Sequence, residues 1–178
     1  QLKSLHHEFG HTMIYVTHDQ TEALTFADKV VVMYDGRVVQ MGTPQELFET
    51  PQHTFVGYFI GSPGMNVLDA TVTGDKAVIG GHEIDLGHGF APLDGKVELG
   101  VRPEFTRLAT GEAGLPVTIK RIEDVGRHKI VRADFNGNEI NVIAEEGAEI
   151  SPDMNRIVFD PAGVNVYANS WRVAPQGA

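Results

Sequence analysis

Residues 13–20 read MIYVTHDQ, an apolar run that stops at His18 and leads into a segment with helical periodicity. The β-branched and aromatic residues from Thr12 to Thr17 are typical of a strand that is buried on both faces. From Asp19 to Ala27, acidic and amide residues come first and apolar residues then fall on one stripe, which predicts a helix. His18 is therefore expected at the carboxyl end of a strand, where α/β sheets bind ligands and an imidazole can donate a hydrogen bond to a phosphate.

The next segments continue an α/β pattern. Residues 29–42 read as two apolar strands joined by an Asp-Gly turn, which predicts a hairpin. A helix is expected to begin at Thr43, which can cap it, with proline and glutamate in the first turn. A further short helix is predicted from His53 to Ile60, and the glycines and proline of residues 61–64 end it.

The rest of the chain is dominated by short strand patterns, glycines and hairpin signals. Asn136-Gly137 is a strong turn signal between two of these strands. Many short strands at this spacing predict a barrel or a sandwich. The candidate strands are Val67–Thr73, Ala77–Ile79, Val97–Val101, Val117–Glu123, Lys129–Phe135, Glu139–Ala144, Arg156–Phe159 and Asn165–Tyr167.

Residues 13–66 as a whole closely resemble the end of the nucleotide-binding domain of ABC importer ATPases. The resemblance is greatest to the carbohydrate and glycerol-phosphate uptake subfamily, which includes the ATPase subunit of the maltose importer. The remaining residues resemble the regulatory domain of that subfamily, with residues 99–104 (LGVRPE) as the matching motif. The resemblance implies an α/β remnant, the end of a RecA-like ABC nucleotide-binding domain, in residues 1–61, followed by an all-β OB-like barrel in residues 62–178.

By this resemblance His18 is the switch histidine, a catalytic and cofactor-binding residue that contacts the terminal phosphate of ATP. The alternative is a histidine that only caps the following helix. The intact subunit would bind ATP and magnesium and couple ATP hydrolysis to uptake of a sugar or glycerol-phosphate-type solute through transmembrane permease subunits. The barrel would form a homodimer or receive regulators, and the subunit would be cytoplasmic, peripheral on the inner face of the cell membrane.

A complete ATPase of this class requires a glycine-rich phosphate loop that ends in Gly-Lys-Ser/Thr. The nearest approach, residues 89–97 (GFAPLDGKV), has one intervening residue too many and a valine in place of the metal-binding hydroxyl. The loop is expected upstream of Gln1, as are the acidic strand end and the signature loop of the family. The chain is thus expected to be a carboxyl-terminal piece that binds no cofactor and hydrolyses no ATP alone.

A rival motif lies at residues 7–11 (HEFGH), which formally match the H-E-x-x-H pattern of zinc hydrolases. Gly10 reads better as the end of a helix, which would take His11 off the face that His7 occupies. No third ligand follows at a suitable distance within the same helix. Zinc hydrolysis is therefore disfavoured, and no metal site is predicted.

Charge and composition exclude several classes of partner. Residues 1–60 hold three basic and seven acidic side chains (net −4), and residues 61–178 hold eleven and seventeen (net −6). An OB-like fold without a basic cluster and with a single tryptophan disfavours nucleic-acid binding. The absence of cysteine removes disulfides and thiolate metal sites. No apolar run approaches the ~18 residues of a membrane-spanning helix, so direct membrane insertion is not expected.

A different class of function is a stand-alone OB-like module that binds an oligosaccharide or an oxyanion. Arg102 could bind an anion or pair with Glu104, and the favoured interpretation is a structural salt bridge beside a proline-fixed turn. Trp171 is expected to be a packing residue. The last strands, around residues 164–167 and 171–173, are expected to close the barrel.

Overall fold

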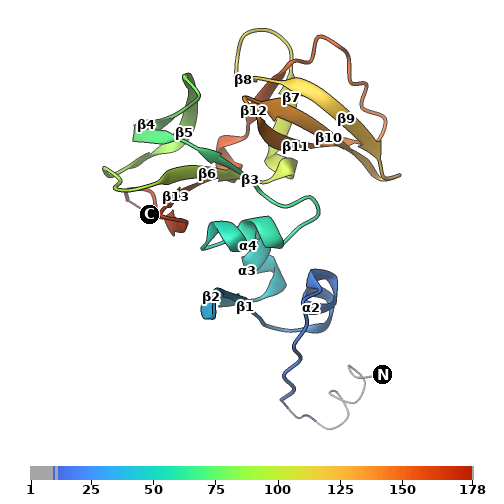
Figure 1. Cartoon of the computed structure of the whole chain (residues 1–178), viewed down its shortest axis with the longest axis vertical. Helices are drawn as coiled ribbons and strands as arrows, with labels where there is room; N and C mark the ends of the chain where they lie inside the picture. The colour runs from blue at the N-terminus through green and yellow to red at the C-terminus, as the bar shows by residue number, and fades with distance from the viewer. Residues whose placement is uncertain (1–9, 11, 178) are drawn as a thin grey trace.

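The computed structural model describes residues 10 and 12–177. Figure 1 shows a small part with helices and one hairpin beneath a larger part built of strands. The elements of the smaller part are α2 (Gln20–Phe26), β1 (Val30–Tyr34), β2 (Arg37–Gly42), α3 (Pro44–Glu49) and α4 (Thr54–Phe59).

Local capping and turn chemistry sets the limits of these elements. The side chain of Asp19 accepts hydrogen bonds from two backbone amides of the first turn and so caps α2. Asp35 and Gly36 adopt positive φ angles of 49° and 71°, as the tight turn between β1 and β2 requires. Thr43 and Glu46 form the predicted capping box at the start of α3. The predicted hairpin and all three helices are therefore confirmed.

The segment from Thr12 to Thr17 is not a strand in the structure, and this sequence-based prediction was wrong. It runs toward α2 without a ladder to any described residue, and Ile14 and Val16 are 91% and 87% exposed. A strand needs a hydrogen-bonded neighbour in addition to apolar side chains, and residues 12–177 offer none at this position. Apolar content alone therefore does not make this segment a strand.

The larger part consists of short strands and two 3-10 turns. Strands β6 and β12 begin and end at the residues that the sequence predicts, whereas β5, β7 and β8 were not predicted. The elements are β3 (Asn66–Asp69), β4 (Thr71–Ile79), β5 (His82–Phe90), β6 (Val97–Val101), η1 (Pro103–Phe105), β7 (Thr106–Ala109), β8 (Leu115–Pro116), β9 (Thr118–Asp124), β10 (His128–Phe135), β11 (Asn138–Glu145), β12 (Arg156–Phe159), η2 (Pro161–Gly163), β13 (Val164–Ala168) and β14 (Trp171–Val173).

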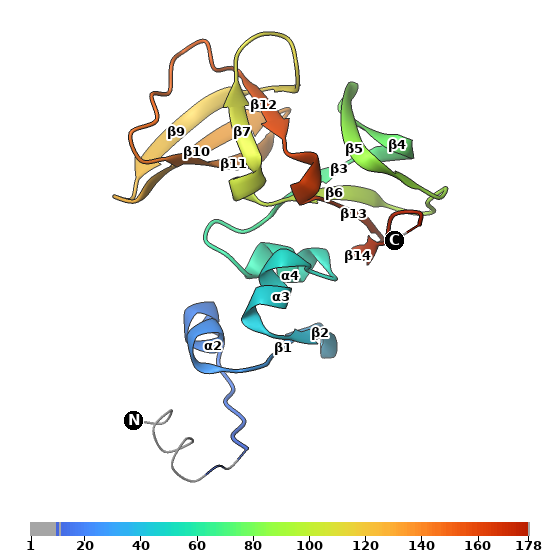
Figure 2. The same ribbon diagram turned by 180° about the vertical axis from the view of Figure 1, so that it is seen from behind.

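These strands form separate antiparallel sheets, and within residues 12–177 no closed barrel is present. The sheet orders are β14-β13-β6-β3, β11-β10-β9, β7-β12-β8 and β4-β5. Figure 2 shows the first of these in the middle, with β9–β11 on one side and β4–β5 on the other. The final strand pair does not close a barrel, because β13 is the one strand of the described residues with which β14 forms a ladder. A closed barrel leaves no free sheet edge, whereas in residues 12–177 these sheets share no ladder with one another and keep their edge strands.

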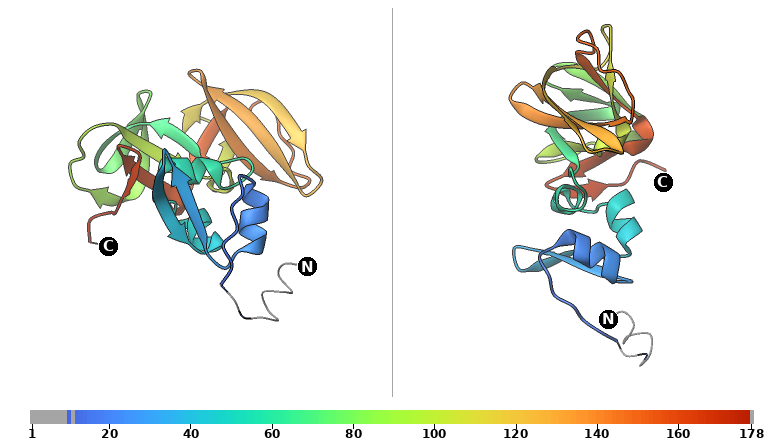
Figure 3. Two further views of the ribbon diagram at one scale, coloured as in Figure 1. Left: turned by 60° about the horizontal axis from the view of Figure 1, so that its bottom comes forward. Right: turned by 90° about the vertical axis from the view of Figure 1, so that its right-hand side faces the viewer.

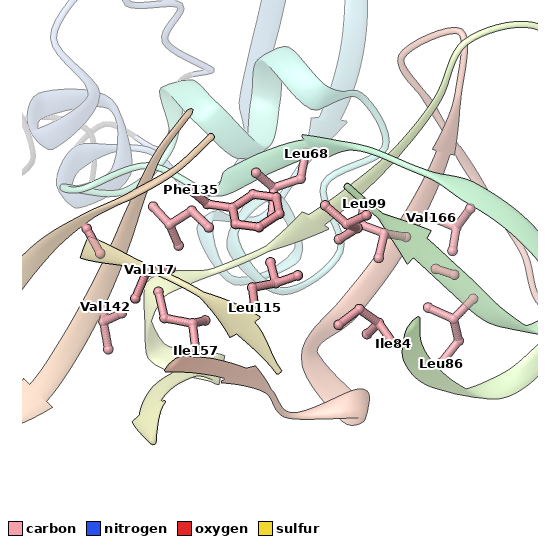
Figure 4. Packing of buried hydrophobic residues seen from close by; sticks show 14 of the residues in the cluster. Leu68, Ile84, Leu86, Leu99, Leu115, Val117, Phe135, Val142, Ile157 and Val166 are labelled. Atoms are coloured by element: carbon pink, nitrogen blue, oxygen red, sulfur yellow. The ribbon is translucent and has the colours of Figure 1, made fainter. Parts of the chain in front are cut away.

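Two apolar clusters lie in the two parts. The larger joins the sheets of the β part, and Figure 4 shows Leu68 and Leu99 on the β3–β6 side together with Phe135 and Leu115. The smaller lies between the hairpin and helices α3 and α4, and its buried members are Val32, Val39, Leu47, Val56 and Ile60. The hairpin is therefore held to the helices by one of its faces.

Candidate functional site

His18 lies at the end of the unpaired segment, directly before the residue that caps α2. Its side chain is exposed and makes no hydrogen bond to the described part of the chain. The amides of Thr21 and Glu22 donate to Asp19 Oδ1, at 2.7 and 3.1 Å, so Asp19 rather than His18 caps the helix. The imidazole is consequently free to contact a ligand.

Side chains on both sides of His18 hold its backbone. The Thr17 hydroxyl donates to Glu22 Oε2 at 2.9 Å and accepts from the amide of Asp19 at 3.0 Å. The Tyr15 hydroxyl donates to the same carboxylate oxygen at 3.1 Å, and this hydrogen bond raises the pKa of the Tyr15 phenol. The loop that carries the imidazole is thus anchored to the first turn of α2.

One apolar face of the β1–β2 hairpin has no cover among the described residues. Val31 pairs with Met41 and Met33 with Val38 across the hairpin, and these four side chains are 49–64% exposed. The right-hand view of Figure 3 shows the β1–β2 hairpin and α2 at the end of the molecule opposite the larger β part. Contiguous exposed apolar side chains of this kind mark a surface that contacts another protein segment.

Arg102 lies where the β part meets the helices, and the predicted salt bridge with Glu104 is not formed. Its side chain is 4% exposed and donates to backbone carbonyls, from Nε to Phe48 O at 2.6 Å and from Nη1 to Ile60 O at 2.6 Å. A weaker contact joins Nη2 to Leu47 O at 3.4 Å, and the guanidinium lies 3.9 Å from the Phe48 ring centroid. Burial lowers the pKa of Arg102. No bound anion is needed, because carbonyl oxygens at the ends of α3 and α4 accept its hydrogen bonds.

Trp171 packs edge-on against His53, with ring centroids 4.8 Å apart, and 49% of its surface stays exposed. The backbones of these two residues also form an isolated bridge. Trp171 therefore contacts His53 while about half of its surface stays open, and its packing role stays a prediction.

A hollow of about 750 Å³ lies beside β7 and β11. Arg107 pairs there with Asp160 at 3.4 Å, which leaves further carboxylates on the rim. The acidic side chains outnumber the two arginines that line the hollow, Arg107 and Arg127, so its charge gives the oxyanion-binding alternative little support. The acidic residues that line it are Glu104, Glu145, Glu146, Glu149 and Asp160.

Within residues 12–177 no group of histidines and carboxylates could hold a metal ion. His7 and His11 of the H-E-x-x-H match lie outside the residues that the structure describes. No helix in the described part of the chain is long and apolar enough to cross a membrane.

Comparisons with known proteins agree with this architecture. Residues 61–105 match the family model of the MalK OB fold domain. The sn-glycerol-3-phosphate import ATP-binding protein UgpC 1 of Rhizobium johnstonii is 39% identical over 175 residues, which are 94% of this chain and 47% of that protein. The sulfoquinovosyl glycerol transport ATP-binding protein SmoE of Agrobacterium fabrum is 35% identical over 178 residues, 94% of this chain and 49% of that protein.

The chain spans about half the length of the curated relatives that it matches. A third relative, the UgpC protein of Paracoccus denitrificans, is 38% identical over 145 residues. These similarities confirm the resemblance to ATP-binding subunits of sugar and glycerol-phosphate ABC importers, and they identify an OB fold domain in the mostly β part of the chain.

Proposed function

We propose that this chain is the carboxyl-terminal part of an ATP-binding subunit of an ABC importer. Residues 1–61 would be the end of the nucleotide-binding domain, and residues 62–178 the OB-like regulatory domain. The observation that carries the proposal is the 39% identity over 94% of the chain to a glycerol-phosphate import ATP-binding protein. The solute would be a sugar or a glycerol-phosphate-type molecule.

The exposed surface of the first part supports this assignment. The hairpin buries one face on α3 and α4, while Met33 and Met41 on the other face are 59% and 64% exposed. Two-faced apolar strands are typical of α/β domains in which both faces are covered. The rest of a nucleotide-binding domain would supply that cover.

His18 would donate a hydrogen bond to the terminal phosphate of bound ATP. Its exposure, and the capping of α2 by Asp19 instead, leave the imidazole nitrogens available for this contact. ATP with magnesium supplies the phosphoryl group whose transfer to water releases free energy. The part of His18 is to hold a proton against a phosphate oxygen and so to distinguish ATP from ADP.

The partners in this proposal follow from the same assignment. Transmembrane permease subunits would bind the intact subunit and hold it on the cytoplasmic side of the membrane. The regulatory domain would mediate homodimerisation.

The proposal is tested in the full-length gene product with the substitution His18→Ala. Steady-state ATP hydrolysis should fall about 100-fold, the typical cost of removing one hydrogen-bond donor to a charged transition state. The melting temperature should not change, because the side chain is exposed and forms no hydrogen bond within the described residues. His88→Ala, which removes an exposed histidine on β5, serves as the control. A hydrolysis rate of His18→Ala within threefold of the unsubstituted protein would contradict the assigned role.

The competing function is a stand-alone module that binds an oligosaccharide or an oxyanion. Calorimetry on the 178-residue chain distinguishes it from the importer subunit. Titration with maltose, glycerol 3-phosphate and sulfate should release no binding heat at millimolar concentrations. A saturable heat for one of these solutes, together with absent ATPase activity of the full-length protein, would favour the module instead.

A further inference from the structure

The carboxamide of Gln20 holds the peptide backbone of Gly61, which lies 41 residues further along the chain. The amide of Gly61 donates to Gln20 Oε1 at 2.8 Å, and Gln20 Nε2 donates to Gly61 O at 3.4 Å. Gln20 is the first residue of α2 and lies two positions after His18. In Figure 3 helix α2 lies beside the segment that follows α4, so the contact joins two distant parts of the sequence.

The same peptide group is held from its other side by Arg102. The carbonyl of Ile60 and the amide of Gly61 belong to one peptide unit, and that carbonyl accepts from Arg102 Nη1 at 2.6 Å. A single peptide plane therefore connects the Gln20 carboxamide to the guanidinium. Hydrogen bonds in series polarise one another, so each strengthens the next in a partly buried site.

Gly61 is suited to this position for steric reasons. Its φ angle is +117°, and an added Cβ would lie 3.0 Å from Arg102 Nη1 and 3.1 Å from Pro63 O. The close approach of guanidinium and backbone thus requires the absence of a side chain.

Arg102 is in turn fixed to the strands. Its carbonyl accepts a hydrogen bond from the Thr106 hydroxyl at 3.0 Å, and the fully buried Thr106 begins β7. The preceding residue, Val101, ends β6 and pairs with both Asn66 and Val164. A displacement of Arg102 would therefore reach the centre of the β part.

We propose that Gln20 is a positioning residue that couples the His18 loop to the OB-fold part through the Ile60–Gly61 peptide and Arg102. This inference rests on the proposed function, in which His18 contacts nucleotide. Asp19 fixes Gln20 as the first helical residue, so a shift of His18 toward a phosphate moves the carboxamide with it. Two sites joined in this way share a coupling free energy, typically a 5- to 150-fold effect on equilibrium.

The test compares hydrogen exchange in the full-length protein with and without a non-hydrolysable ATP analogue. In the unsubstituted protein, the analogue should slow exchange both at residues 13–19 and at residues 58–66. With Gln20→Ala the slowing at 13–19 should persist, whereas that at 58–66 should shrink at least fivefold. Gln20→Glu keeps an acceptor for the Gly61 amide and should restore part of the response.

The control is Gln45→Ala, because among the residues that the structure describes the Gln45 side chain bonds only to Glu49 of the same helix, at 2.8 Å. It should leave both responses intact. An unchanged response at 58–66 in a folded Gln20→Ala variant, or a response in Gln20→Glu no larger than in Gln20→Ala, would overturn the coupling and leave the proposed function standing. An analogue effect at 13–19 without one at 58–66 in the unsubstituted protein would do the same. No effect of the analogue at either segment of the unsubstituted protein would overturn both proposals.

Discussion

Replacing Arg102 by methionine should strongly destabilise this chain, because one buried cation satisfies the ends of two helices. The side chain is 4% exposed, and its Nε and Nη1 atoms each donate to a carbonyl at 2.6 Å. Methionine retains an apolar stem of similar length and removes the guanidinium. The carbonyls of Phe48 and Ile60 would then be left without these donors in the junction between the two parts.

The magnitude follows from three contributions. Two hydrogen bonds from a charged donor are each worth about 2 kcal/mol. The contact with the Phe48 ring, at 3.9 Å, adds about 1 kcal/mol. Removing the guanidinium also removes the cost of burying its charge, which offsets about 2 kcal/mol of this loss. The free energy of unfolding should therefore fall by about 3 kcal/mol.

Urea denaturation, followed by circular dichroism, measures this loss. With a slope of about 2 kcal/mol per molar urea, the midpoint should fall by about 1.5 M. Arg107→Met is the matched control, since its side chain is 69% exposed and its ion pair with Asp160 measures 3.4 Å, so it should cost less than about 0.5 kcal/mol. If Arg102→Met lowers the free energy of unfolding by less than 1 kcal/mol, the two carbonyls are satisfied in another way and the reasoning is refuted.

Two further predictions concern α4 and the segment after it. Gly64→Ala would place a Cβ against the backbone carbonyl of Tyr58 and should cost about 2 kcal/mol in a thermal melt, whereas Gly89→Ala meets only a flexible side chain and should cost less than about 0.5 kcal/mol; equal losses would show that the steric account is wrong. Burial lowers the pKa of His53, whose Nδ1 accepts from the amide of Phe55 at 3.0 Å, and the charge of a nearby carboxylate opposes this shift. Its contribution to stability is therefore present above the unfolded-state pKa of about 6.5 and is lost as the pH falls below it. His53→Asn keeps a capping acceptor that does not titrate, and urea midpoints should depend less on pH between 7 and 5; an unchanged slope would contradict this origin.

The sequence located the candidate site but not the contacts that surround it. His18 was found because an apolar run, a histidine and a helix start follow one another, and the structure leaves that imidazole exposed. The roles of Gln20 and Arg102 were not found. Their partners are backbone groups 41 and 42 residues away, and a backbone amide or carbonyl leaves no residue-type signal in a sequence. A glycine followed by Ser-Pro-Gly was the only available sign that the backbone near residue 61 is special.

Turn and capping residues were sufficient to predict where several helices and strands begin and end, because turns and caps act over two to four residues. The Asp-Gly and Asn-Gly turns, the capping box at Thr43 and the strands at 97–101 and 156–159 all form as the sequence predicts. Strand β5 was overlooked because glycines dilute its alternating pattern, although Ile84 and Leu86 point into the core.

Only the tertiary structure decided which strands pair, whether the sheets close, and what receives the charge of Arg102. A strand pattern indicates the apolar face of a segment but not its hydrogen-bonded neighbour. Residues 12–17 accordingly form no ladder with the rest of the described chain, and β14 ends a sheet rather than closing a barrel. An arginine within a turn motif likewise reveals its charge but not the groups that will accept its hydrogen bonds. In the fold the ends of α3 and α4 lie beside Arg102. Their backbone carbonyls accept its hydrogen bonds in place of Glu104, the partner that the sequence predicts.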